Sequence, residues 1–317
     1  MFQFVKNYCK TGLLSLLLLV ATVSVAMGQK TIQEKLGYSK DSKLLIIHAD
    51  DFGMCHSENL ATIKAMEEGV VNSASLMATC PWFTEAAQYS INHPDLDIGM
   101  HLTLTNEWGR YKWGTVADAC EVPSLITSEG FMLEECFDVS KNAKIDEVET
   151  ELRAQIEKAI KQGVNPTHFD SHMGCLFWDR EDIFQVYLKL GKEYKVPVLL
   201  NEGFFSYMTE GKDYSEKFLK YLDDKELVVA REVMMDPGEN TREGLFKYYT
   251  NELTSLESGL NVMLVHVGLN NEELRGITAR AKTRQWDLDY FTSEKCKSIL
   301  KENNIKLVTW REVGAVM

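Results

Sequence analysis

Short runs of β-forming residues alternate with helical patterns along almost the whole chain from residue 43 onward. This alternation is typical of parallel strands joined by crossover helices. The strand candidates are residues 44–49, 73–79, 97–104, 167–171, 196–200, 226–232, 261–268 and 305–310. Eight candidates predict an α/β barrel. The sequence has no internal repeat and no Pro-rich or Ser-rich linker, so we expect a single domain.

The clearest helix is predicted over residues 145–162, and Gly163 and Pro166 follow it as the expected end signals. Helical spacing divides its side chains into an apolar face and a polar remainder. The apolar face contains Ile145, Val148, Leu152, Ile156 and Ile160, whereas Glu147, Glu151 and Lys158 are expected to lie away from it. Further helices are predicted over residues 59–68 and 291–301.

Residues 105–143 break this rhythm. The stretch is too long for an ordinary connection and has little periodicity, which indicates an inserted loop beside a functional site. It follows directly from the third strand candidate.

Residues 1–28 resemble a cleaved secretory signal, because Lys6 and Lys10 precede an apolar run that ends in small residues. The apolar run is too short to span a membrane comfortably, although an uncleaved anchor is the alternative. We therefore expect an exported protein, periplasmic or secreted, whose mature domain covers residues 29–317 and is not stably inserted in a membrane.

The formal net charge of the chain is −13, and removal of Lys6 and Lys10 takes it to −15. Such acidity disfavours nucleic acid and anionic membranes as partners and favours neutral or cationic ligands. Six cysteines remain after cleavage, without the spacing of a zinc ribbon or a disulfide scaffold. Cys120 and Cys136 flank part of the inserted loop and could pair, although buried free thiols are the commoner arrangement.

The first strand candidate ends in two adjacent carboxylates, Asp50 and Asp51, within KLLIIHADDFG. Burying an unpaired carboxylate costs several kcal/mol, so ordinary cores do not place two charges there. Consecutive strand residues face opposite ways, which would let one acid bind a metal and the other act as a base. The structural alternative is a helix N-cap at the strand-to-helix turn.

Histidines recur at the carboxyl ends of other strand candidates, which is where parallel α/β folds bind their ligands. His101 lies in GMHLTLT, His168 and His172 lie in THFDSHMG, and His266 lies in LVHVG. A single histidine in an apolar strand is usually a core residue. One carboxylate and two histidines from different strands, however, make a set of ligands for a divalent metal, and Asp51, His101 and His172 are the predicted set.

His168, Asp170 and His172 alternate along one strand candidate and should share a face while the strand continues. A metal-bound histidine commonly donates its other ring N–H to a carboxylate, so Asp170 is a candidate partner for a ligand histidine. His168 is a candidate structural residue or substrate contact.

The motifs ADDFG, GMHLTLT and THFDSH, in this order and spacing, resemble the YdjC family of carbohydrate deacetylases, which includes the chitin-oligosaccharide deacetylases. The resemblance runs from about Lys43 to the C-terminus, and RQWDLDYFTS over residues 284–293 resembles a late family segment. It implies a distorted TIM-like (β/α) barrel of seven or eight mostly parallel strands. It also implies a bound divalent cation and hydrolysis of N-acetyl groups on sugars.

The resemblance implies that His101 and His172 bind the metal. Analogy with the more distant polysaccharide deacetylases assigns Asp50 as the base and Asp51 as the ligand. The expected chemistry is amide hydrolysis that releases acetate, with His266 as the acid that protonates the sugar amine. The ion is expected to be Mg²⁺ or Zn²⁺.

The sequence departs from the family pattern at two places. Family members often continue with further histidines after DSH, whereas residues 173–176 here read MGCL. The usual His-Pro near the last candidate is His-Val-Gly at His266. These differences affect substrate contacts and the acid, and leave the predicted metal ligands in place.

Aromatic side chains can stack on the flat apolar faces of sugar rings. The candidates near the site are Trp108, Tyr111, Trp113 and Trp178, and the alternative is that they anchor the inserted loop. Trp310, at the end of a strand candidate, is expected in the core.

Two rival functions keep the metal. In one, an ester or phosphoester replaces the amide, and the basic run of Arg275, Arg280, Lys282 and Arg284 meets a phosphate, although a solvated surface run is the simpler interpretation. In the other, the protein is a metal-stabilised carbohydrate-binding module without turnover. Acetate release from an N-acetylated sugar or oligosaccharide distinguishes the expected enzyme from both.

Overall fold

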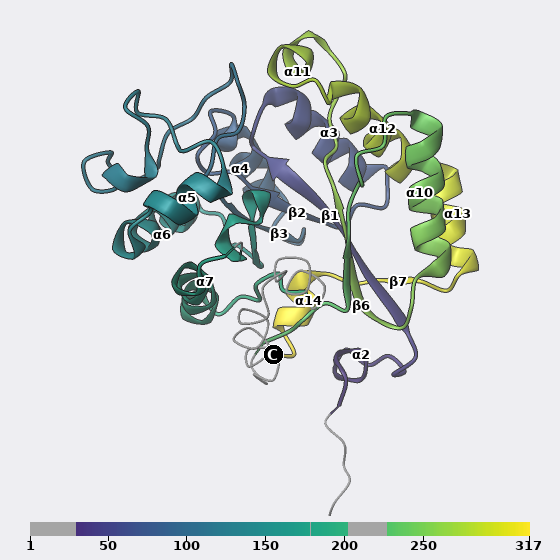
Figure 1. Ribbon diagram of the computed structural model, residues 1–317. Coiled ribbons are helices and arrows are strands. Elements are labelled where there is room, and N and C mark those ends of the chain that lie inside the picture. The colour runs from purple at the N-terminus through teal and green to yellow at the C-terminus, as the bar shows by residue number, and fades with distance from the viewer. Residues whose placement is uncertain (1–29, 178, 202–226) are drawn as a thin grey trace, which may run out of the picture.

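The computed structural model describes residues 30–177, 179–201 and 227–317 and has a parallel sheet at its centre (Figure 1). The strands are β1 (Lys43–Phe52), β2 (Ser73–Leu76), β3 (Ile98–Leu102), β4 (Phe169–Ser171), β5 (Glu232–Met234), β6 (Gly259–Val265) and β7 (Lys306–Leu307). They run in the order β4-β3-β2-β1-β6-β5, and β7 also pairs with β1.

The sheet curves into a distorted TIM-like barrel, which confirms the predicted fold. Among the described residues, isolated parallel bridges continue the circuit between β4 and β5, and they join Phe169 to Val198 and Asn201 to Ala230. The strand candidate at 196–200 therefore contributes a single bridge. The candidate at 226–232 contributes one bridge and, at Glu232, the start of β5, which pairs with β6.

Helices surround this sheet, with α6 and α7 on one side and α10, α12 and α13 on the other (Figure 1). The helices are α2 (Ile32–Lys35), α3 (His56–Glu67), α4 (Phe83–Asn92), α5 (Cys136–Asn142), α6 (Ile145–Gln162), α7 (Glu181–Tyr194), α10 (Arg242–Ser255), α11 (Glu272–Ile277), α12 (Ala281–Phe291), α13 (Glu294–Glu302) and α14 (Trp310–Gly314), with 3₁₀ turns η1 (Pro123–Leu125) and η2 (His172–Phe177). Within the described ranges, no helix has the length and apolar character needed to cross a membrane.

The helix boundaries follow local capping chemistry. The predicted helix 145–162 is confirmed as α6, and Gly163 ends it in the left-handed conformation that glycine favours. The predicted helix 291–301 is wrong at its start, because α12 ends at Phe291 and a new helix begins after Ser293. The Ser293 hydroxyl accepts a hydrogen bond from the Cys296 N–H, which caps α13.

Alternation along β1 explains where the site forms. Leu44 and Ile46 join an apolar cluster with Trp310 and Val313 of α14, which fills one end of the barrel. His48, two residues beyond Ile46, shares this direction by the strand period, and its ring lies 4.9 Å from the His168 ring. The His168 ring in turn lies 5.7 Å from Trp310, so Trp310 is a core residue as expected. The buried histidines His48 and His168 therefore lie next to the apolar cluster around Trp310.

Carboxylates of α6 hold the inserted loop. The helical spacing had predicted that these carboxylates lie away from the packed, apolar face of the helix. Glu147 and Glu151 are instead buried. Glu151 accepts hydrogen bonds of 2.9 Å from the backbone N–H groups of Val116 and Ala117, and Glu147 accepts one of 2.6 Å from that of Ser124. Burial raises the pKa of Glu151 to about 7, against these hydrogen bonds, which lower it. The prediction failed because the loop covers this face of the helix.

A disulfide also ties the loop to the barrel, but it is not the Cys120–Cys136 pair that the sequence allowed beside the commoner free thiols. Cys136, at the start of α5, is bonded to Cys175 in η2, with 5.0 Å between their Cα atoms. Cys120 is a free, exposed thiol. The disulfide thus joins the inserted loop to the segment that directly follows His172.

Replacing Glu151 with alanine should lower the free energy of unfolding by about 1–3 kcal/mol, because the N–H groups of Val116 and Ala117 lose their acceptor. Hydrogen exchange at these two amides should accelerate at the same time. The matched control is Glu157→Ala on the same helix, since Glu157 accepts a hydrogen bond from the Tyr194 hydroxyl and contacts no loop amide in the described contacts. Equal exchange rates in wild type and Glu151→Ala would contradict this anchoring role.

Candidate metal centre and active site

Asp50 and Asp51 line the same cavity, although consecutive strand residues normally face opposite ways. The pairing of β1 with β2 shifts register between Ala49 and Phe52, which is a bulge. Asp51 has a φ of 64°, in the left-handed region that aspartate tolerates better than most residues. Such outliers cost on the order of 1–3 kcal/mol and cluster at functional sites. The bulge therefore turns Asp51 toward the cavity that Asp50 also lines.

The structure brings the three predicted metal ligands together. The His101 Nε2 atom lies 3.1 Å from His172 Nδ1, and the Asp51 Oδ1 atom lies 3.5 Å from the first and 3.3 Å from the second. All three side chains are buried. They come from the ends of β3, β4 and β1, so the predicted convergence of strand ends holds.

The outer ring nitrogen of each histidine contacts a carboxylate. His101 Nδ1 lies 3.0 Å from Asp170 Oδ1, and His172 Nε2 lies 3.0 Å from Glu107 Oε2. An ionised carboxylate only accepts, so in the neutral ring these nitrogens carry the proton and the inner nitrogens present lone pairs. Asp170 occupies the predicted position. Glu107 was missed, and its only signal is its position at the start of the inserted loop.

This donor set fits one divalent cation. The three candidate ligand atoms lie close to one another, and the buried Asp51 Oδ1 atom has no hydrogen-bond partner among the described residues. Metal–ligand distances of about 2.0–2.2 Å imply ligand–ligand separations of roughly 2.8–3.6 Å in octahedral or tetrahedral geometry. The observed separations of 3.1, 3.3 and 3.5 Å lie within that span. The His and Asp groups can therefore bind a metal.

The other Asp51 oxygen contacts Arg284, which the sequence placed in a basic run. Arg284 is buried, unlike the exposed Arg275, Arg280 and Lys282. Its Nη2 atom lies 2.8 Å from Asp51 Oδ2, and its Nη1 atom pairs with the buried Glu58. Burial alone would raise the pKa of Asp51, but the charge of Arg284, together with both histidines, holds this pKa well below its usual range.

Asp50 is the carboxylate that remains free of strong partners. His48 Nε2 lies 3.4 Å from Asp50 Oδ1, and His266 Nε2 lies 3.6 Å from Asp50 Oδ2. The buried Oδ1 atom has no hydrogen-bond partner within the described part of the chain. Burial raises the pKa of Asp50, which favours its taking up a proton.

His266 follows β6, and α12 fixes its backbone. The His266 N–H donates a 3.2 Å hydrogen bond to Asp287, which also accepts one of 2.8 Å from the Tyr249 hydroxyl. Burial raises the pKa of Asp287 to about 7. Arg284 and Asp287 lie three residues apart on α12 and share a face, so one helix supports Asp51 on one side and His266 on the other.

Two further buried histidines, His48 and His168, lie next to the candidate metal ligands and Asp50. His48 Nε2 lies 2.9 Å from Asp170 Oδ2, and its Nδ1 atom lies 2.8 Å from the Ser73 hydroxyl. His168 contacts the Thr167 hydroxyl at 2.9 Å, and burial lowers its pKa to about 4. His168 is fully buried and is not among the residues that line the cavity, which favours the structural one of its two predicted roles.

The tryptophans of the inserted loop anchor it. Trp113 is 3% exposed and donates through Nε1 to the Thr105 carbonyl at 3.0 Å, and Trp108 is 9% exposed. The Tyr111 hydroxyl donates to the Met54 carbonyl. The anchoring alternative therefore describes these rings, and Trp178 lies outside the described residues.

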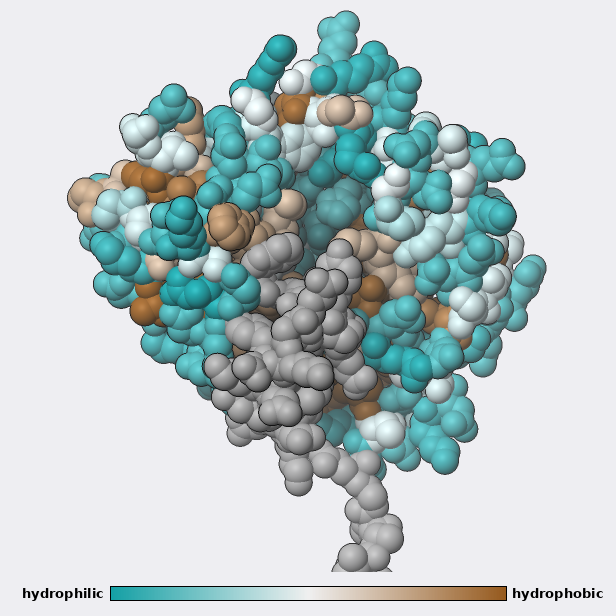
Figure 2. Space-filling view, in the orientation of Figure 1, coloured by the Kyte–Doolittle hydropathy of each residue, from teal (hydrophilic) through white to brown (hydrophobic). Residues whose placement is uncertain are grey.

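The site cavity has a volume of about 290 Å³. Its lining combines acids, histidines and Arg284 with apolar side chains, which are called the apolar wall below and are those of Met173, Phe177, Leu199, Met235 and Leu264. Figure 2 shows that the viewed face is hollowed near its centre, where the deepest visible residues are hydrophilic. The cavity thus combines a polar cluster with a surface that suits an apolar group.

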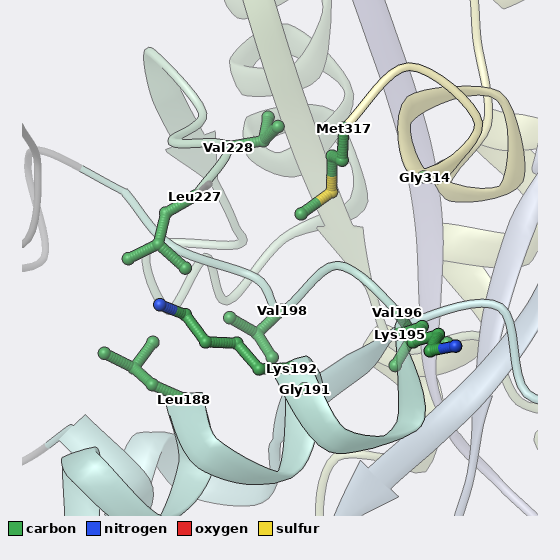
Figure 3. A pocket seen from close by; sticks show the side chains of 10 residues that line it. All are labelled: Leu188, Gly191, Lys192, Lys195, Val196, Val198, Leu227, Val228, Gly314 and Met317. Carbon is green, nitrogen blue, oxygen red and sulfur yellow. The ribbon is translucent and has the colours of Figure 1, made fainter. Parts of the chain in front are cut away.

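A second cavity, of about 370 Å³, lies beside α7 and α14 (Figure 3). Its described lining is mostly aliphatic, and Lys192 and Lys195 supply its charged side chains. It contains no carboxylate or imidazole side chain among those described residues. We therefore place the candidate active site at the carboxyl ends of the strands.

The fold and the site define a β/α-barrel protein with a cluster of histidines and aspartates that can bind a metal. The chain belongs to the YdjC-like protein family, whose model matches residues 44–302. A carbohydrate deacetylase from Brevibacillus brevis is 30% identical over 288 residues, covering 85% of this chain and 99% of that protein.

Two further matches also extend over most of both chains. A carbohydrate deacetylase from Thermus thermophilus is 28% identical and covers 88% of this chain and 97% of its own. The crystal structure of a candidate cellobiose-phosphate cleavage protein from Enterococcus faecalis matches with a TM-score of 0.71 at 24% identity. That match covers 86% of this chain and 99% of the other and supports the same fold.

Asp51→Asn should keep the fold, because asparagine also tolerates the left-handed backbone, and should weaken divalent-cation binding by at least about tenfold. Isothermal titration with Zn²⁺ or Mn²⁺ measures the affinity, and circular dichroism checks folding. Asp95→Asn, at an exposed position, is the control. Unchanged affinity in a folded Asp51→Asn protein would exclude Asp51 as a ligand.

Proposed function

We propose that this protein hydrolyses N-acetyl groups on sugars or oligosaccharides and releases acetate, with a divalent cation held by Asp51, His101 and His172. The observation that carries the proposal is the buried, unbonded Asp50 oxygen beside three converging metal-ligand atoms. The relatives described as carbohydrate deacetylases support the choice of the acetyl amide as the bond that is cleaved and of carbohydrates as the substrate class.

Asp50 acts as the base in this reaction. A divalent cation would supply an electrophile for the acetyl carbonyl oxygen and would lower the pKa of water towards about 7. Asp50 takes one proton from the water molecule that attacks the acetyl carbon. Its raised pKa suits this role, because a base whose pKa is closer to the working pH accepts and releases protons more readily.

His266 acts as the acid. Its Nε2 atom lies within 3.6 Å of Asp50, so base and acid border the same reaction space. When the carbon–nitrogen bond breaks, the proton that Asp50 took from the water passes through His266 to the nitrogen, which leaves as the free amine of the sugar. The hydrogen bond from its backbone to Asp287 keeps this residue at the cavity.

The apolar wall accounts for substrate binding better than the tryptophans do. Met173 and Met235, which are 48% and 42% exposed, line the cavity together with Phe177. These side chains suit the acetyl methyl group or the apolar face of a sugar ring. They replace Trp108 and Trp113 as the proposed sugar contacts.

Three of the basic residues on which the phosphoesterase alternative depends are engaged by other side chains. Arg284 is engaged by Asp51 and Glu58, Arg280 pairs with Asp236, and the Arg275 side chain donates to Asn270. These three arginines therefore do not form a set of free guanidinium groups for a phosphate.

Asp50→Asn should lower acetate release by at least about 100-fold while divalent-cation affinity stays near the wild-type value, because the base is lost and the ligands remain. The substrates are a panel of N-acetylated mono- and oligosaccharides, assayed with chelator and with metal added back. Asp95→Asn again serves as the control. Full activity in metal-loaded Asp50→Asn rules out the base, and binding without acetate from wild type favours the non-catalytic module.

We also propose export with cleavage before Gln29, although residues 1–29 lie outside the described residues. The Cys136–Cys175 disulfide supports an oxidising compartment. Expression of the full chain in a bacterium with the general secretory pathway should give a mature protein that begins at Gln29 in the periplasm or medium. N-terminal sequencing checks this, and a mature protein that retains Lys6 in the cytoplasm would contradict it.

A further inference from the structure

Arg284 makes three contacts that hold its guanidinium in one place. Its Nη2 atom bonds to Asp51 Oδ2 at 2.8 Å, its Nη1 atom pairs with Glu58, and its Cζ atom lies 5.4 Å from the ring centroid of Trp108. Arginine presents a planar, rigid fork that matches carboxylates. The side chain connects α12 to β1 and α3 inside the protein.

The Asp51 carboxylate needs an external constraint. It stands at a register shift of β1 with a left-handed backbone, so regular strand pairing does not set the direction of its side chain. Its Oδ1 atom lies 3.3 Å from His172 Nδ1 and 3.5 Å from His101 Nε2. A bond to Oδ2 from the opposite side fixes the plane of the carboxylate.

We propose that Arg284, itself held by Glu58, is a positioning residue of the metal centre, which orients Asp51 so that Oδ1 faces His101 and His172. The inference rests on the metal centre of the proposed function and adds a determinant of its affinity. Arg284 is not a catalytic residue in this account, because it acts through Asp51.

Two other roles for Arg284 make different predictions. If it only adjusted the local charge, its removal would strengthen cation binding, because a positive group beside a cation site repels the cation. If it bound an anionic substrate, its removal would leave metal affinity unchanged. Positioning predicts weaker metal binding despite the lost repulsion. The sign of the change therefore separates the three roles.

The experiment measures the affinity of the purified protein for Zn²⁺ and Mn²⁺ by competition with a fluorescent chelator. Arg284→Lys keeps the charge but loses the fork, and Arg284→Gln loses the charge. Both should bind the metal about 10–100-fold more weakly, the range found when a partner behind a metal ligand is removed. Acetate release by Arg284→Lys should recover at saturating metal. Arg280→Lys, an exposed change next to α12, is the matched control and should leave affinity unchanged.

Glu58→Leu tests the same proposal without altering Arg284. Loss of its anchor should weaken metal affinity in the same direction, and this result keeps the test usable if the Arg284 variants do not fold. Unchanged or tighter metal binding in the folded variants overturns the proposal while the metal centre stands. Absence of metal binding by the wild-type protein overturns the metal centre and this inference with it.

Discussion

The hydrogen bonds to the buried carboxylate of Asp170 are the interaction on which the rest of the site depends. Asp170 is 2% exposed and contacts His48, His101 and the Ser75 hydroxyl at 2.8–3.0 Å. Burial would raise its pKa, yet its histidine partners lower it far below the usual value. An ionised Asp170 fixes the proton on His101 Nδ1 and leaves Nε2 to face Asp51. Asp170 thereby determines which lone pair His101 presents in its proposed role as a metal ligand.

The inserted loop completes the centre from the other side. It supplies Glu107, which contacts His172 as Asp170 contacts His101, so the two histidines that we propose as ligands have equivalent carboxylate partners from different parts of the fold. The Cys136–Cys175 disulfide holds this loop three residues beyond His172. Buried glutamates of α6 hold its middle section by accepting backbone hydrogen bonds. The loop thus supports the proposed metal centre as well as covering one face of α6.

Local patterns in the sequence predict the strand ends and their ligands, because alternation and strand direction are short-range properties. The α6 boundaries and the set Asp51, His101 and His172 follow from such patterns. Partners distant in sequence do not: Arg284 looks like part of a solvated run, and only its packing against Asp51, 233 residues away, shows otherwise. The predicted exposure of Glu151 is wrong for the same reason. Helical periodicity predicts that an acid off the apolar face is exposed, and it cannot show that the inserted loop covers this one.

We propose that Asp51, His101 and His172 form one divalent-cation site at the end of the barrel. Anomalous scattering from a crystal soaked in Mn²⁺ or Zn²⁺ locates such a cation without relying on activity. We expect one strong peak at about 2.0–2.3 Å from Asp51 Oδ1, His101 Nε2 and His172 Nδ1. Absence of a peak there at saturating metal, or a peak coordinated by other residues in its place, would contradict it.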